Sequence, residues 1–337
     1  MRPFGNPRGW ALALVLALGL VAAGGAVSTA RADGQPPSAT PATDDGVIQS
    51  VGLPGSRLGA NSDQITFLPT GAAQPVTLTV DRMADKLTLD QGARPGDRIW
   101  LTVDDPLNPR HVVQITRLAR PAPVLQRLIA LGAAFAIIAA LAALATAGRP
   151  WKFLVGDDNR MSNSQVQLVL WFGVVAVVYG ADLILRAWFL GWDFIGGISM
   201  TTNVLAMTGL SGLSFGAAKV VAVQKSAGAS ALAVTPPAPG ASATPAAPAP
   251  PAVAAKPKFT DLVLNDYGDA DLGDFQMILI SSAATVIFAC ASWEFLTLID
   301  IAKTTTLPDV DTALLGSFGI GQGAYLIKKA ALPNGVG

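Results

Sequence analysis

The apolar stretch ALGAAFAIIAALAALAT, residues 130 to 146, decides the fold class of this chain. With Leu125 and Leu128 before it, and with Arg127 and Arg149 near its two ends, it is long enough to cross a bilayer as a helix. Four further apolar runs follow it, at about residues 168–185, 203–223, 277–298 and 313–327. The sequence therefore predicts an α-helical membrane domain of about five transmembrane helices.

The composition supports this class. Hydrophobic residues make up 51% of the chain and charged residues 14%, well below the roughly one quarter that is usual in soluble domains. The formal net charge is zero, so no basic surface points to nucleic acid as a partner. Because His111 and Cys290 are the only histidine and cysteine, the composition excludes a disulfide framework and a His/Cys metal cluster within one chain. We expect no cofactor and no enzymatic activity.

The N-terminus has the pattern of an export signal. Arg2 and Arg8 precede an apolar run over residues 10–23, and small residues lead to a cleavage site after Ala32. The alternative is an anchor helix that is not cleaved. Both interpretations place the next segment on the outer face of a bacterial inner membrane.

Residues 33–121 show short alternating apolar stretches between Gly, Pro, Asn and Asp, which predict a small all-β exported domain, either a sandwich or a barrel. His111 is expected at a surface or an edge of it. The predicted strands are 47–51, 64–68, 75–80, 86–89, 98–103 and 111–118.

After a first span within 124–148, the rest of the chain predicts two similar halves, 149–223 and 261–330. A polar lead-in opens each half, and Asp157 and Gln167 align with Asp266 and Gln276 without a gap. Ser162 and Gln165 predict a capping box for the first helix, and Asp271 or Gly273 a cap for the second. Both halves start and end on the side that is rich in lysine and arginine, so we expect two parallel helix-pair repeats and a cytoplasmic C-terminus.

The segment between the halves, 224–260, is rich in alanine and proline and predicts a semi-extended cytoplasmic linker. The lead-in with Ser162, Ser164 and Gln167 and the two Gly-rich helices that end in lysine resemble a group of uncharacterised bacterial multi-pass membrane proteins. The resemblance covers Asp157 to Lys329 and implies no activity.

Glycines recur three and four residues apart along one face of each Gly-rich helix, where they favour close helix packing. They could pack the third span on the fifth, contact other subunits, or line a narrow pore. The residues are Gly209, Gly212, Gly216, Gly316, Gly319 and Gly323.

Ionisable residues within the spans are few, so each is informative. Asp182 and Arg186 are four residues apart and predict a local ion pair, whereas Glu294 has no partner in its own helix. The acidic residues 266–274 lack the spacing of a calcium loop, and helix capping explains part of them.

We expect a non-enzymatic membrane protein that anchors the exported β-domain as a structural subunit of an oligomeric envelope assembly. Its partners would be membrane lipids and further copies or other envelope proteins. One alternative is a channel or transporter whose path is lined by Gln322, Ser211, Ser214 and Glu294. Another is a transmembrane sensor.

Overall fold

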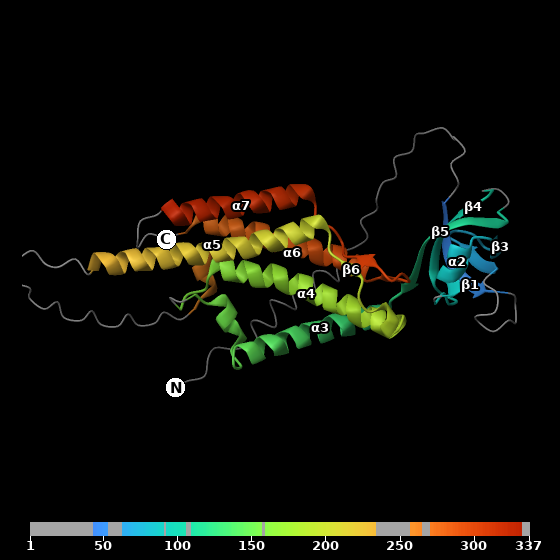
Figure 1. Ribbon diagram of the computed structural model, residues 1–337, viewed down its shortest axis with the longest axis horizontal. Coiled ribbons are helices and arrows are strands. Elements are labelled where there is room, and N and C mark those ends of the chain that lie inside the picture. The colour runs from blue at the N-terminus through green and yellow to red at the C-terminus, as the bar shows by residue number, and fades with distance from the viewer. Residues whose placement is uncertain are drawn as a thin grey trace, which may run out of the picture. The chain divides into compact units, whose positions relative to one another are not determined.

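The computed structural model describes residues 43–52, 63–90, 92–105, 109–156, 159–233, 257–264 and 270–331 (Figure 1). The predicted signal peptide, most of the linker, Asp157 and Asp266 lie outside these residues. The chain divides into two compact units. The first contains the N-terminal part up to Ala134 together with Val178–Ser199 and Cys290–Leu307, and the second contains Phe135–Val177, Met200–Ala289 and the chain from Pro308.

The first unit contains a small β-barrel. Its strands are β1 (Thr43–Val51), β2 (Gln64–Pro69), β3 (Val76–Val80), β4 (Arg98–Val103) and β5 (His111–Pro121). β1 pairs antiparallel with β2 and β4, β2 pairs with β3, and β4 with β5. A short parallel pairing of β3 with β5 closes the ring. This connectivity, with one helix between the third and fourth strands, is that of the OB fold, a five-stranded and partly open Greek-key barrel.

The strands form where the sequence alternates apolar and polar residues, because alternate side chains point to opposite faces of a sheet. In β2, for example, Ile65 and Phe67 are fully buried, while Thr66 between them is half-buried. The predicted small all-β domain is therefore present, and five of its six predicted strands are confirmed.

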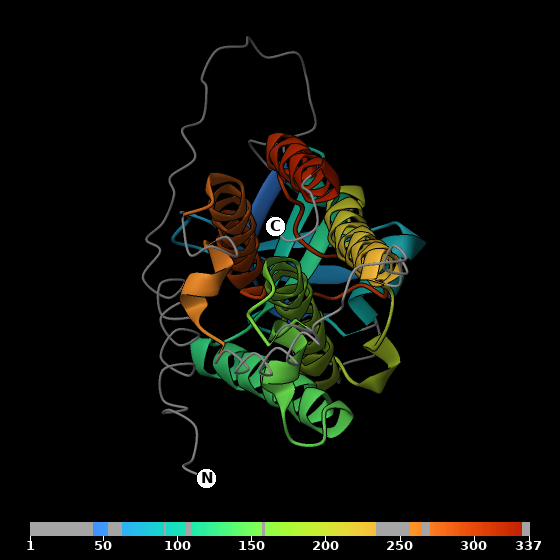
Figure 2. The same ribbon diagram turned by 90° about the vertical axis from the view of Figure 1, so that its left-hand side faces the viewer.

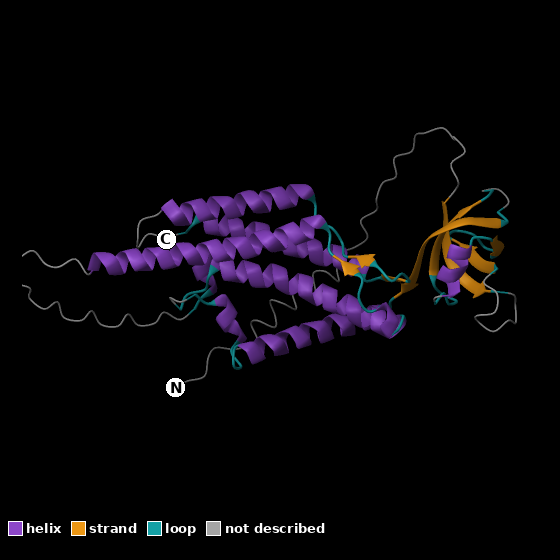
Figure 3. Ribbon diagram, viewed as in Figure 1, coloured by secondary structure: helices purple, strands orange, loops and turns teal. Residues whose placement is uncertain are grey.

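The sixth predicted strand, residues 86–89, is wrong. These residues belong to a helix, α2 (Met83–Asp90), drawn within the barrel region of Figure 3. Asp85 and Leu89, one helical turn apart, are its buried residues, and the Thr88 hydroxyl donates to the Ala84 carbonyl over 2.9 Å. Ala84, Lys86 and Leu87 are good helix formers, and a four-residue window was too short to reveal the helical period.

The barrel core also contains residues from distant parts of the chain. Phe194 and Ile301 pack in the same buried cluster as Ile65, Leu78 and Leu101. In addition, β7 (Leu298–Asp300) pairs antiparallel with the end of β5. The exported domain predicted at residues 33–121 is therefore incomplete without residues that follow the later helices.

Three long helices each contribute residues to both units: α3 (Val124–Ala145), α4 (Asn163–Phe189) and α6 (Leu272–Phe295). By length and composition these three helices of the described residues are able to cross a membrane. Only 11% of the apolar window of α3 is buried, so its surface is almost entirely apolar and uncovered. The structure thus combines apolar helices of membrane-spanning length with a separate β-domain.

Two further helices, α5 (Thr202–Ala233) and α7 (Thr312–Ala331), occupy the predicted third and fifth spans. They lie side by side, as Figure 2 shows with α5 in yellow and α7 in red. Neither is among the three candidate spans found in the described residues. α5 also continues through residues 224–233, which were predicted as linker, since no proline occurs before Pro236.

The two lead-ins have the same local structure. A 3-10 helix comes first in each, η1 (Pro150–Leu154) and η3 (Phe259–Leu262). An isolated bridge then joins Val155 to Met161 and, in the second lead-in, Leu264 to Ala270. The backbone N–H of Ser162 donates to Leu154 O over 2.9 Å, and that of Asp271 donates to Val263 O over 2.8 Å.

The helix caps follow the prediction in the second lead-in only. Asp271 Oδ1 accepts hydrogen bonds from the backbone N–H groups of Gly273 and Asp274, so Asp271 caps α6. The capping box predicted from Ser162 and Gln165 is wrong. The backbone N–H of Ser162 donates to Leu154 O instead, and Gln165 Oε1 is buried without a hydrogen-bond partner.

Candidate functional site

Three buried arginines of the first unit make contacts at helix ends. Arg120, near the end of β5, makes the most complete set of contacts. Its Nε and Nη2 donate to the two carboxylate oxygens of Asp97 over 2.8 and 2.9 Å. Its remaining contacts are to the carbonyls of Phe189, the last residue of α4, and Gly92, both at 2.6 Å. Arg120 is 8% and Asp97 2% exposed, so the two form a buried ion pair. The carbonyls of Phe189 and Gly92 accept the remaining hydrogen bonds of the guanidinium.

Arg186, in the last turn of α4, is fully buried. Its guanidinium donates to the carbonyls of Phe194 over 3.0 Å and Ala302 over 2.5 Å, with longer contacts to Asp300 and Lys303. The expected ion pair with Asp182 is not among the salt bridges of the described residues, and Asp182 Oδ2 is buried without a hydrogen-bond partner. Arg186 therefore binds two backbone segments at the end of α4, one at Phe194 and one at residues 300–303.

Arg127, in the first turn of α3, lies over the ring of Trp293 at 4.3 Å from the ring centre. Its Nη1 donates to the Trp293 carbonyl over 3.3 Å. The contact joins the first turn of α3 to the last turn of α6 by a cation–π interaction. We call Arg120, Arg127 and Arg186 the arginine junction.

Only part of the arginine junction can be predicted from the sequence. Arg186 stands out as a charge within a span and Arg127 as the flank of the first span, whereas neither of these patterns marks Arg120. An arginine at the end of a strand is usually exposed. The signal that could have found it is the pair of prolines, Pro121 and Pro123, which place Arg120 directly before a long apolar helix.

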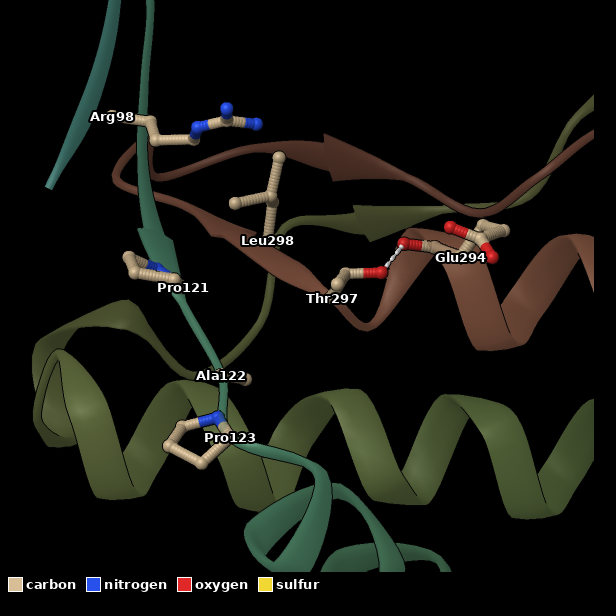
Figure 4. Close-up of a pocket in the computed structure, with 7 residues that line it drawn as sticks. All are labelled: Arg98, Pro121, Ala122, Pro123, Glu294, Thr297 and Leu298. Carbon is tan, nitrogen blue, oxygen red and sulfur yellow. Dashed lines mark hydrogen bonds between the residues drawn. The ribbon is translucent and has the colours of Figure 1, made fainter. Parts of the chain in front are cut away.

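A shallow recess opens beside the arginine junction (Figure 4). Its volume is about 490 Å³, and Glu294 and Arg98 are its two charged residues. Glu294, expected on an ion path, is exposed at the end of α6, and its carbonyl accepts a hydrogen bond from the Thr297 hydroxyl. We call this the Arg98–Glu294 recess; it is lined by Arg98, Pro121, Ala122, Pro123, Glu294, Thr297 and Leu298.

Buried polar side chains form a network in the second unit. Gln322 Nε2 on α7 donates to Gln167 Oε1 on α4 over 2.8 Å, and Gln167 Nε2 donates to Asn163 Oδ1 over 2.7 Å. Asn163 then donates to the carbonyl of Asp274 on α6 over 3.2 Å. Ser211 and Ser214 on α5 are buried as well, and the buried Ser281 hydroxyl on α6 has no hydrogen-bond partner. Of the four residues expected to line a path, three are thus buried in this unit, and Gln167 is an additional member.

The glycine faces are largely uncovered by the residues that the structure describes. A methyl group added to Gly209, Gly212, Gly216, Gly316 or Gly323 would meet no atom within 4 Å. Gly319 is the exception, since its added carbon would lie 3.6 Å from Leu210. Close packing of α5 on α7 therefore does not account for the other five glycines.

The outer surface of β2 and β3 is the face with which OB barrels bind oligonucleotides and oligosaccharides. Here its side chains are Gln64, Thr66, Leu68, Thr77 and Thr79, and the hydroxyls of Thr66 and Thr77 lie 3.0 Å apart. Along these two described strands the face carries hydroxyl and amide groups and the aliphatic Leu68, and none of the aromatic side chains on which bases stack.

At one end of the barrel, His111 is exposed, as expected, and its Nδ1 lies 2.8 Å from Asp81 Oδ2. Nearby, Asp104 Oδ1 accepts the backbone N–H groups of His111 and Arg110, and these two hydrogen bonds hold the pKa of Asp104 below its ordinary value. No group of three or more His, Cys, Asp or Glu residues in the described ranges could hold a metal ion.

Comparison with protein-family models, with curated proteins and with solved structures finds no match to this chain. The arrangement of its own residues is therefore the basis for proposing a function.

Proposed function

We propose that this protein is a non-enzymatic, multi-pass membrane protein that holds an exported β-barrel at the membrane surface, as a structural subunit of an oligomeric envelope assembly. The arginine junction carries the proposal. Within one compact unit, Arg120 joins the barrel to the end of α4, Arg186 joins the end of α4 to the segment after β7, and Arg127 joins the start of α3 to the end of α6. A barrel on a flexible tether would not need such contacts.

Membrane insertion is supported by the three apolar helices and by aromatic side chains beyond their ends. α3 spans about 33 Å and α4 about 40 Å at 1.5 Å per residue, enough to cross the hydrocarbon core. Trp188 and Trp192 are exposed at the end of α4 nearer the barrel, and Trp151 and Phe153 are exposed in the 3-10 helix before α4. Tryptophan is enriched at both membrane interfaces.

We include α5 and α7 as the third and fifth spans, which makes five. The lead-ins with matching hydrogen bonds support an internal duplication, and so do the caps of α5 and α7. Thr201 Oγ1 accepts the backbone N–H of Val204, and Asp311 Oδ1 accepts that of Ala313. Each repeat would then consist of one strongly apolar helix and one Gly-rich helix. Arginine and lysine flanks favour a barrel outside and a C-terminus in the cytoplasm.

Assembly with further copies is supported by the open glycine faces. Small residues on an exposed helix face allow another helix to approach closely in lipid. Leu205, Leu213 and Val220 are exposed along the face of α5 that carries Gly209, Gly212 and Gly216. We expect the full chain, extracted in a mild detergent, to form a particle larger than one copy by light scattering corrected for detergent.

The matched variants for this test are Gly212→Leu on the exposed face of α5 and Gly132→Leu on α3, both at glycines with no atom near an added carbon. We expect Gly212→Leu to reduce the particle size and Gly132→Leu to leave it unchanged. A wild-type particle of one copy would refute the assembly part of the proposal.

A channel or transporter is the second candidate, and the buried polar network of the second unit favours it. Gln167, Gln322, Ser211 and Ser214 are expensive to bury among apolar helices, and the Ser281 hydroxyl is unpaired. Solute or ion flux into liposomes that contain the purified protein would support this function. Flux that is abolished in a Gln322→Leu variant would favour it over the structural role.

A further inference from the structure

The two charged side chains of the Arg98–Glu294 recess form no ion pair with other described residues. Neither side chain takes part in a salt bridge or side-chain hydrogen bond of the described residues. Glu294 interacts electrostatically with Arg127, but Arg127 is bound to Trp293. The recess therefore presents one cationic and one anionic group to a ligand.

Two helix ends border the same recess. Pro123 directly precedes α3, which begins at Val124, and Glu294 and Thr297 lie on either side of the end of α6 at Phe295. The start of a helix carries a partial positive charge and its end a partial negative charge. A backbone hydrogen bond from Ala122 N to Thr297 O, 2.9 Å long, fixes the two ends beside each other. The helix ends thus add to the separation of charge made by the two side chains.

The recess also lies where two candidate spans end. The residues that follow it on α3 are apolar and exposed, with Val124 53% and Leu125 68% accessible, and Leu128 and Ile129 continue the surface. In a membrane this surface would contact acyl chains, while the recess would lie at the height of the headgroups.

We propose that the recess binds the headgroup of a zwitterionic phospholipid, with the phosphate at Arg98 and the ammonium at Glu294. The inference rests on the proposed membrane insertion. An anionic lipid without an amine would leave Glu294 unpaired beside a negative headgroup, and free phosphate would not use the apolar surface of α3. A headgroup with both charges satisfies both side chains, and its chains cover Val124 and Leu125.

The test uses the full chain, purified in a mild detergent and stripped of lipid, with thermal stability measured as lipid is added. We expect phosphatidylethanolamine to raise the unfolding midpoint more than phosphatidylglycerol. Arg98→Gln should weaken the response to phosphatidylethanolamine about tenfold in concentration, the effect of losing one charge-assisted contact. Glu294→Gln should keep a response to both lipids but lose the preference between them.

Two controls make the test specific. Arg94→Gln removes an equal charge from an exposed position outside the recess and should respond like the wild type. Soluble glycerophosphoethanolamine, which has the headgroup without chains, should stabilise far less than the lipid. An equal effect of the soluble compound would overturn the lipid assignment, and equal behaviour of Arg98→Gln and Arg94→Gln would overturn the site.

If Arg98→Gln does not fold, Arg98→Lys provides the second variant, and it should retain a weaker response because it keeps the charge. Failure of this inference can be separated from failure of the proposed function by alkaline extraction of membranes. A chain that is released by alkali overturns membrane insertion. A chain that stays in the membrane while the lipid preference is absent overturns the headgroup site alone.

Discussion

At the scale of single residues, the Arg120–Asp97 pair tests the stability of the barrel. Both groups are almost fully buried, and Arg120 donates two hydrogen bonds to the Asp97 carboxylate. Removal of one partner leaves a buried charge without compensation, which costs about 3–5 kcal/mol. We expect Arg120→Met to lower the free energy of unfolding by about this amount, measured by chemical denaturation of the detergent-solubilised protein.

The matched control is the pair of Arg117 with Asp300. Arg117 Nε lies 2.6 Å from Asp300 Oδ1, but the Arg117 side chain is 43% exposed and the Asp300 side chain 25%. Arg117→Gln should therefore cost only about 0–1 kcal/mol. Equal losses for Arg120→Met and Arg117→Gln would contradict the role of the arginine junction.

A second prediction at this scale concerns pH. Hydrogen bonds from the backbone N–H groups of His111 and Arg110 lower the pKa of Asp104 in the folded chain. The unfolded chain then binds its proton more readily, so the carboxylate stabilises the fold above about pH 4, and this contribution is lost as the pH falls through the folded pKa. We expect Asp104→Asn to reduce the slope of stability against pH below about pH 4.

The measurement is the midpoint of thermal unfolding between neutral and strongly acidic pH. Asp193→Asn is the control, because Asp193 is exposed and its carboxylate accepts no hydrogen bond in the described residues. An unchanged slope for Asp104→Asn would show that the two hydrogen bonds do not stabilise the charged form.

At the scale of elements, Gly197 and Gly196 test the connection between α4 and α5. Both glycines have positive φ, +65° and +98°, which side chains rarely adopt. A Cβ atom added at Gly197 would overlap the Lys303 carbonyl oxygen. A Cβ atom added at Gly196 would have no atom of the described residues within 4 Å. Gly197→Ala should therefore lower the thermal midpoint more than Gly196→Ala, since only the first must displace the pairing of Thr305 with Gly197.

The hydrogen bond between Gln167 and Gln322 tests the contact between α4 and α7. A double-mutant cycle with Gln167→Leu and Gln322→Leu should give a coupling of about 1 kcal/mol, as for other hydrogen bonds between membrane helices. Gln165, whose Oε1 has no partner, provides a control that should not couple to Gln322. A coupling near zero for the first pair would mean that the two helices separate in detergent.

Alternation and apolar runs, which are local signals, predicted most of these elements. Ile65 and Phe67 identify a strand by alternation, and residues 130–146 identify α3 by length. The rest depends on contacts between distant residues. Three residues, Leu298 to Asp300, cannot be recognised as a strand until they pair with Ala119, Arg120 and Pro121. The recess cannot be predicted for the same reason, since Arg98 and Glu294 line one recess only in the folded chain.

At the scale of the whole molecule, the central claim is a barrel on one side of a membrane and the two lead-ins on the other. The exposed Cys290 is the single cysteine, so a Cys290→Ser background allows one new thiol to be placed at a time. Thr77→Cys on the outer face of β3 and Thr260→Cys in η3 are suitable positions, because both side chains are exposed.

The most direct measurement is labelling of these two variants in intact cells with a thiol reagent that does not cross the inner membrane. We predict that Thr77→Cys is labelled in intact cells and that Thr260→Cys is labelled only after the membrane is permeabilised. Labelling of both variants in intact cells, or of neither before permeabilisation, would contradict the proposed arrangement of an exported barrel and cytoplasmic lead-ins.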